Sequence, residues 1–186
     1  MEIDDLYGVA GVSRRERVRI ALARGGGMDQ ADKVAALRDA VQALHGVRAE
    51  SALVGGVAVG LRSGIPRATL DTDLAVVSTA DRARVVRALL DAGFSLRGEF
   101  AHSVNFRHVS GEPVRLVFDP AFDPMIERAE DTRLGEVTVR VVTTSDLIAM
   151  KERAAADPAR RRSKALRDAA DAALLRGDVP DPDEGW

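Results

Sequence analysis

The sequence predicts an α+β fold in which a β-sheet is flanked by helices. Short apolar runs typical of strands alternate with segments whose apolar residues recur at helical spacing. Two of these runs are separated by a Ser110-Gly111 turn, which is typical of an antiparallel hairpin. The last third is rich in Ala, Arg and Leu and lacks β-branched runs, so it predicts two helices, over residues 145–156 and 159–175.

The first elements are a helix, a strand and a second helix. Apolar residues at helical spacing over residues 34–44 predict an amphipathic helix. Residues 51–54 form a short apolar run that is broken by the glycine pair Gly55-Gly56. Residues 57–64 then suggest a short helix, so this part of the chain is a strand, a glycine turn and a helix.

The middle of the chain supplies most of the expected strands. Residues 70–77 are apolar around two aspartates and predict a strand with one buried face, and residues 81–93 predict a helix. Further strands are expected at residues 94–96, 103–109 and 113–118. Prolines then interrupt the pattern. A short helix at 125–129 and a last strand at 137–142 precede the two C-terminal helices.

Length and composition predict one globular domain with short extensions. The chain has 186 residues, of which 46% are hydrophobic, enough to bury a core. A Gly25-Gly26-Gly27 triplet ends a charged opening segment. We therefore expect an N-terminal appendage at residues 1–27, a domain at residues 28–176 and an extended tail at residues 177–186.

Charge and cysteine content exclude several classes of protein. The 27 Lys and Arg nearly balance the 29 Asp and Glu, so any nucleic-acid binding requires a local basic patch. No cysteine is present, which excludes disulfide frameworks, thiolate zinc sites and cysteine nucleophiles. No apolar stretch is long enough to cross a bilayer, and the N-terminus does not look like a secretory signal. We expect a cytoplasmic protein without a membrane partner.

Asp71 and Asp73 are the first candidate metal ligands. Residues two apart on a strand share a face, so the two carboxylates are expected to lie close together. Carboxylate oxygens suit magnesium, which is commonly held by one or two carboxylates and substrate phosphates. An Asp-x-Asp pair also arises by chance at a solvated strand edge.

Gly55 and Gly56 are the candidate phosphate cradle. They lie where a strand passes into a helix, a place where backbone amides can approach a phosphate and the helix N-terminus favours negative charge. A tight turn that binds nothing has the same sequence.

The order and spacing of the two pairs resemble the signature of the DNA polymerase β-type nucleotidyltransferase superfamily. The resemblance rests on Leu53-Val54-Gly55-Gly56-Val57-Ala58 followed by Gly64-Ile65-Pro66-Arg67-Ala68-Thr69-Leu70-Asp71-Thr72-Asp73-Leu74. It implies a nucleotidyltransferase fold, with a mixed β-sheet flanked by helices and C-terminal helices packed on it. It also implies that the glycine pair lies beside a triphosphate and that the aspartates bind magnesium.

The C-terminal helices resemble those of AbiEii-like toxins and related minimal nucleotidyltransferases. By this resemblance Lys151 contacts nucleotide phosphate and assists catalysis, and Asp168 or Asp171 supports the site from the following helix. The alternatives are an exposed helix lysine at 151 and, for Asp168, a surface ion pair with Lys164.

The sequence departs from the superfamily at the third acidic residue. The matching strand, residues 113–118, places Arg115 at the expected position. Asp119 has the same parity but lies about 13 Å further along at strand rise, so it is a weak metal candidate. Arg115 can instead pair with a phosphate oxygen as a fixed positive charge.

Arg67 and Thr69 precede the aspartate pair in an Arg-x-Thr-x-Asp-x-Asp run. An arginine there can steady a phosphate, and the threonine can form a hydrogen bond. Turn chemistry after Pro66 explains the same residues equally well.

One dense basic patch stands out near the C-terminus. It comprises Arg160, Arg161, Arg162, Lys164 and Arg167. Such a cluster can bind an RNA backbone such as that of tRNA by releasing counterions. It also fits the solvated start of a helix.

Two functions are compatible with these features. The first is a magnesium-dependent nucleotidyltransferase that moves a nucleoside monophosphate from a triphosphate to a hydroxyl on RNA, protein or a small molecule. The resemblance makes such a protein a candidate toxin with an antitoxin partner. The alternative, motivated by Arg115, is a catalytically degenerate module that binds a nucleotide or a partner.

Overall fold

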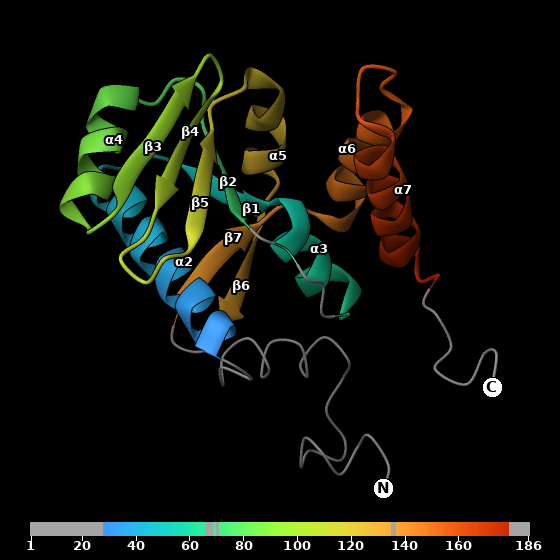
Figure 1. The fold of residues 1–186 in the computed structure, drawn as a ribbon, viewed down its shortest axis with the longest axis horizontal. Helices are drawn as coiled ribbons and strands as arrows, with labels where there is room; N and C mark the ends of the chain where they lie inside the picture. The colour runs from blue at the N-terminus through green and yellow to red at the C-terminus, as the bar shows by residue number, and fades with distance from the viewer. Residues whose placement is uncertain (1–27, 66–68, 70, 135–136, 179–186) are drawn as a thin grey trace, which may run out of the picture.

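The expected α+β fold is confirmed by a computed structural model of the chain (Figure 1). The structure describes residues 28–65, 69, 71–134 and 137–178. The predicted appendage 1–27, most of the predicted tail and Arg67 lie outside the described residues. Every helix in the described part of the chain is too short or too polar to cross a lipid bilayer.

Seven strands form one mixed sheet in the order β3-β4-β5-β2-β1-β7-β6. Their bounds are β1 Ser51–Val54, β2 Thr72–Val76, β3 Ser95–Phe100, β4 Ser103–Arg107, β5 Pro113–Val117, β6 Glu130–Leu134 and β7 Val137–Val141. β2 and β5 are parallel neighbours, as are β1 and β7, whereas the other neighbours are antiparallel. The expected hairpin is β4 and β5.

The helices are arranged around this sheet. They are α2 Met28–Gly46, α3 Gly55–Ser63, α4 Arg82–Asp91, the 3-10 helix η2 Pro120–Phe122, α5 Asp123–Glu127, α6 Thr144–Ala156 and α7 Arg162–Arg176. Figure 1 shows α6 and α7 side by side at one end of the molecule. They pack on each other and on α3, and Arg128 forms an ion pair with Asp146 of α6.

Local sequence explains where the helices begin and end. Asp81 caps α4 by accepting a hydrogen bond from the backbone amide of Arg84 at 3.1 Å, as its position in the sequence predicts. Thr143 caps α6 by accepting from the amide of Asp146 at 3.1 Å. Gly64 ends α3 in the left-handed conformation, with φ of 75°, which glycine adopts without strain.

Side chains alternate between the two faces of the sheet along each strand, and the central strands β1 and β2 are buried on both faces. On β4, Val104 and Phe106 are fully buried, whereas Asn105 between them is half-buried. On β2, Leu74 and Val76 share one face, whereas Asp73 shares the other face with Ala75, which is also buried in the core. The candidate site therefore lies at the start of β2, on a face that becomes buried in the core further along the strand.

Three elements differ from the sequence-based expectation. β6 was not predicted, because Glu-Asp-Thr-Arg-Leu is a charged edge strand that pairs only with β7. β2 begins at Thr72, so Asp71 immediately precedes the strand and only Asp73 lies within it. The expected strand at residues 94–96 extends further, to Phe100.

Candidate active site

The junction of β1 and α3 brings the glycine pair against Asp73. Val54, the last residue of β1, is the cross-strand partner of Asp73. Gly55 follows with φ of 71°, a conformation that glycine readily adopts. A Cβ on Gly55 would lie 2.3 Å from Oδ2 of Asp73, so only glycine leaves room for the carboxylate. The strand, glycine turn and helix predicted from sequence are confirmed.

The start of α3 is suited to an anion. No side chain caps its first turn, and its first turn contains no acidic residue. Gly55 and Gly56 present backbone without side chains there. Because the first amides of a helix lack partners within the helix and carry partial positive charge, they favour a phosphate.

Asp73 forms an ion pair with Arg115 on the neighbouring strand. The two residues are register partners in the parallel pairing of β2 and β5. Nε of Arg115 lies 2.9 Å from Oδ1 of Asp73. The Asp73 side chain is 14% exposed, whereas that of Arg115 is 47% exposed. Arg115 is therefore at the site, in contact with the candidate metal ligand.

The charges around Asp73 act in opposite directions. Burial raises the pKa of the Asp73 carboxyl above its ordinary value, and the nearby negative charge of Asp71 adds to this increase. The positive charges of Arg115 and Lys151 oppose it. Lys151 on α6 is therefore close enough to Asp73 for its charge to influence that carboxyl.

Lys151 is buried in a cluster of charges between α6 and α7. Its Nζ donates to Oδ1 of Asp168 at 2.8 Å and lies 2.7 Å from Oδ2 of Asp171. Nε of Arg160 contacts the other oxygen of Asp168 at 2.5 Å. The alternative that Lys151 is an exposed helix lysine is wrong. The alternative that Asp168 forms a surface ion pair with Lys164 is also wrong, because Asp168 pairs with Lys151 and Arg160.

The cluster keeps Asp168 ionised. Burial alone would raise the pKa of Asp168, but hydrogen bonds from Lys151 and Arg160 outweigh it, so the pKa is lowered. Asp168 and Asp171 therefore hold Lys151 in a defined position at the end of the site nearest α7.

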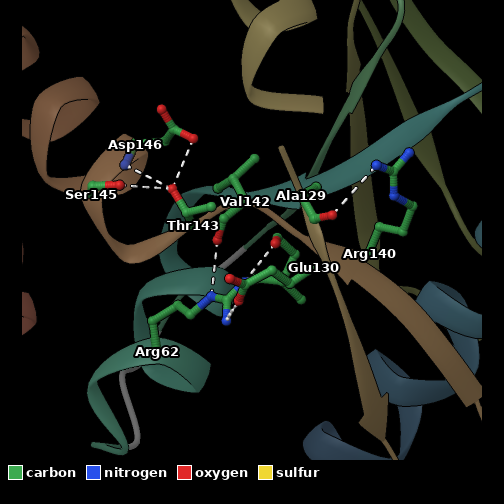
Figure 2. A network of polar contacts seen from close by, with 9 residues as sticks. Arg62, Ala129, Glu130, Arg140, Val142, Thr143, Ser145 and Asp146 are labelled. Atoms are coloured by element: carbon green, nitrogen blue, oxygen red, sulfur yellow. Dashed lines mark hydrogen bonds and ion pairs between the residues drawn. The ribbon is translucent and has the colours of Figure 1, made fainter. Parts of the chain in front are cut away.

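A polar network fixes α6 relative to α3 (Figure 2). Arg62 on α3 donates from Nε to the carbonyl of Val142 at 2.9 Å and from Nη2 to that of Val141 at 2.6 Å. Its Nη1 pairs with Glu130 at 2.7 Å. Thr143, the next residue, caps α6. This network thereby links the helix that begins with the glycine pair to the start of the helix that carries Lys151.

Other predicted residues are less closely connected to the site. Thr69 donates from its hydroxyl to the carbonyl of Asp71 at 3.3 Å, a contact that belongs to the turn before β2. Asp119 lies beyond the end of β5, where it caps η2 by accepting from the amide of Ala121 at 2.9 Å. The structure does not bring Asp119 together with Asp73. Arg115 is the residue of that strand that reaches it.

Most of the basic patch is exposed at the start of α7. Arg161, Arg162, Lys164 and Arg167 are all exposed. Arg160 is the exception, since Asp168 holds it. The cationic surface therefore lies on the helix that supplies Asp168 and Asp171.

Solved structures with the same fold are nucleotide-transferring enzymes and a related protein. The lincosamide antibiotic adenylyltransferase LnuA, bound to lincomycin, aligns with a TM-score of 0.54 and 11% identity over 75% of this chain and 93% of that one. The antibiotic-resistance factor ANT(2'')-Ia aligns with a TM-score of 0.51 and 16% identity, covering 78% and 90%. An antigenic nucleotidyltransferase-like protein from Paracoccidioides brasiliensis aligns with a TM-score of 0.51 and 22% identity, covering 84% and 80%. No curated protein sequence matches the chain.

The chain shares the fold of these structures, and it places the glycine pair at the junction of β1 and α3 beside Asp73. Residues 36–184 match the family described as nucleotidyl transferase AbiEii toxin, type IV TA system, and the chain belongs to this family.

Proposed function

We propose that the chain is a magnesium-dependent enzyme that moves a nucleoside monophosphate from a nucleoside triphosphate to a hydroxyl on an acceptor. The observation that carries the proposal is the contact between the Asp73 carboxylate and Gly55 at the start of α3. It brings a candidate metal ligand to the same point as backbone amides that favour phosphate.

The residues present fit one magnesium ion. Asp71 and Asp73 supply carboxylate oxygens, the ligand type that magnesium prefers. In the described part of the chain, no three His, Cys, Asp or Glu side chains gather closely enough to enclose a metal by themselves. Two carboxylates suit an ion that also keeps water and phosphate ligands. When bound, it would neutralise charge on the reacting phosphates.

The chain's own residues would bind and orient the triphosphate. Amides of Gly55 and Gly56 at the start of α3 would hold phosphate oxygens, and Lys151 would neutralise charge that develops during transfer. Asp168 and Asp171 would position the Lys151 ammonium. Arg67 and Thr69 remain candidates for a further phosphate contact in the segment before Asp71.

The reaction balances without a further reactant. The acceptor hydroxyl oxygen forms a bond to the α-phosphorus, and the bond from that phosphorus to the oxygen bridging to the β-phosphorus breaks. Pyrophosphate leaves with the electron pair, and the hydroxyl proton passes to water. Positioning and electrostatic stabilisation supply most of the catalysis in such transfers.

The acceptor we favour is an RNA such as tRNA. Arg161, Arg162 and Lys164 are exposed at the start of α7, the helix that also supplies Asp168, and such a patch attracts a phosphate backbone. Arg160 forms an ion pair with Asp168, so its contribution to RNA binding would be made next to that carboxylate. Proteins and small molecules are the other acceptor classes. Because the family is one of toxins of toxin–antitoxin systems, we further propose a protein antitoxin that restrains this activity.

Transfer of label tests the proposal. Purified protein would be incubated with magnesium and each of the four triphosphates labelled at the α-phosphate, either alone, with tRNA or with a cell extract. We expect one triphosphate to label one of these fractions, and the Asp71→Asn, Asp73→Asn double variant to leave that fraction unlabelled. Absence of label from all three fractions with every triphosphate would rule out the proposal and favour a nucleotide-binding module.

A further inference from the structure

Asp73 has different neighbours on its two sides in the sheet. On the side of β1, Gly55 lies against Oδ2. On the side of β5, Arg115 lies against Oδ1, at 2.9 Å from Nε. The carboxylate therefore separates the start of α3 from a guanidinium group on the neighbouring strand.

These two sides correspond to the two ends of a transfer reaction, an assignment that rests on the proposed function. In such a displacement the attacking and leaving oxygens lie roughly in line on opposite sides of phosphorus. If the amides of Gly55 and Gly56 hold the leaving phosphates, the acceptor approaches from the opposite side. Arg115 lies on that side of Asp73.

Arg115 is well placed to act on a ligand. Its side chain is 47% exposed, although Nε is held by Asp73. Among the described residues, Asp73 is its only partner, so its Nη groups remain available as donors. The planar guanidinium can donate to a carboxylate and a phosphate oxygen at the same time.

The same position is unfavourable for a second divalent ion. In two-metal sites the ions lie about 3.5–4 Å apart and share oxygen ligands. The register partner of Asp73 on β5 is a cation, and no cluster of three acidic or imidazole groups exists among the residues that the structure describes. A second ion there would be repelled by Arg115 and would lack ligands.

We infer that Arg115 is the fixed cation on the acceptor side of the site, and that the chain binds a single divalent ion together with its triphosphate. Arg115 keeps Asp73 in place through Nε and donates from its Nη groups to an oxygen of the α-phosphoryl group. It is a binding and charge-neutralising residue, in a place where a second metal ion would otherwise act.

Manganese stoichiometry tests the inference that the chain binds a single divalent ion. Manganese would replace magnesium, and free manganese would be measured by electron paramagnetic resonance in the presence of a non-hydrolysable triphosphate. Wild type is expected to bind one ion per chain in its triphosphate complex. Arg115→Asp, which supplies a third carboxylate beside Asp73, is expected to bind two. Two ions in wild type would overturn the inference.

Affinities of Arg115→Gln test the inference that Arg115 is a fixed cation that binds phosphate. Removing the cation should tighten manganese binding to the nucleotide-free protein several-fold, because repulsion near Asp73 is lost. The same change should weaken binding of the triphosphate analogue in EDTA by about tenfold, because a charged hydrogen bond to phosphate is lost. Opposite shifts are not expected from simple unfolding, which would weaken both.

Arg97→Gln is the matched control, because Arg97 is an exposed arginine on β3 and loses the same charge. Both of its affinities should equal those of wild type. If Arg115→Gln behaved like this control, the inference would be wrong. One manganese ion and opposite affinity shifts without any transfer of label would sustain the inference and contradict the proposed reaction. Transfer of label with two bound ions would support the proposed reaction and contradict the inference.

Discussion

The carboxylate of Asp73 lies where a side chain at position 55 would begin, since a Cβ on Gly55 would be 2.3 Å from Oδ2. Gly55→Ala should therefore move Asp73 and strain the backbone, whose φ is 71°. The backbone alone should cost about 1–2 kcal/mol of unfolding free energy. We expect label transfer to fall at least about tenfold, as it does for misplaced reacting groups.

Gly46→Ala is the control for this substitution. Gly46 ends α2, and a Cβ there would meet nothing within 4 Å. Urea unfolding and label transfer should both be close to wild type. A Gly55→Ala protein with wild-type activity would show that the contact between Gly55 and Asp73 is not required.

Lys151 should also be important for stability. Lys151→Met leaves Asp171 without this cation and leaves Asp168 with Arg160 alone, in a buried place. Removing one partner of a buried ion pair typically costs about 3–5 kcal/mol. Lys164→Met, which changes an exposed lysine on α7, should cost far less. Urea unfolding of both variants measures the difference, and equal midpoints would contradict the buried cluster.

The Asp168 cluster predicts a loss of stability in acid. The pKa of Asp168 is lower in the folded protein than its ordinary value of about 3.9. The cluster's contribution is therefore complete above that ordinary value and is lost as pH falls through the lower folded value. Asp168→Asn should make unfolding free energy less dependent on pH below about 4. Urea titrations across that range would show parallel curves for both proteins if Asp168 were not involved.

The sequence predicted the parts of the site that depend on residues close to one another along the chain. Gly55 and Asp73 follow from the spacing of two short motifs, and β1, α3 and most of β2 from apolar runs. The contact between Arg115 and Asp73 could not be predicted from the spacing of motifs or from apolar runs. It depends on β5 lying next to β2 in the sheet, which hydrophobic periodicity does not specify.

The C-terminal helices show a similar limit. Their positions were predicted from composition, and the resemblance directed attention to Lys151, Asp168 and Asp171. The burial of Lys151 was not evident, because it depends on how α6 and α7 turn toward each other. β6 was missed because its charged residues suit an edge strand, where alternation of apolar residues is weak.

RNA binding should depend on the exposed start of α7. Arg161→Gln, Arg162→Gln and Lys164→Gln together should weaken tRNA binding and make it less dependent on salt, because fewer counterions are released. Fluorescence anisotropy at several salt concentrations measures both effects. The control triple variant changes Arg84, Arg87 and Arg97 to Gln on α4 and β3. Equal losses in the two triple variants would indicate a general charge effect, with no specific role for α7.

The most direct measurement compares triphosphates labelled at the α- or the γ-phosphate, in wild type and in Asp73→Asn, with the acceptor that wild type labels. Nucleotidyl transfer predicts that the α-label enters the acceptor, that the γ-label appears in pyrophosphate, and that Asp73→Asn transfers at least about 100-fold less. Entry of the γ-label into the acceptor, or equal transfer by Asp73→Asn, would contradict the reaction assigned to this site.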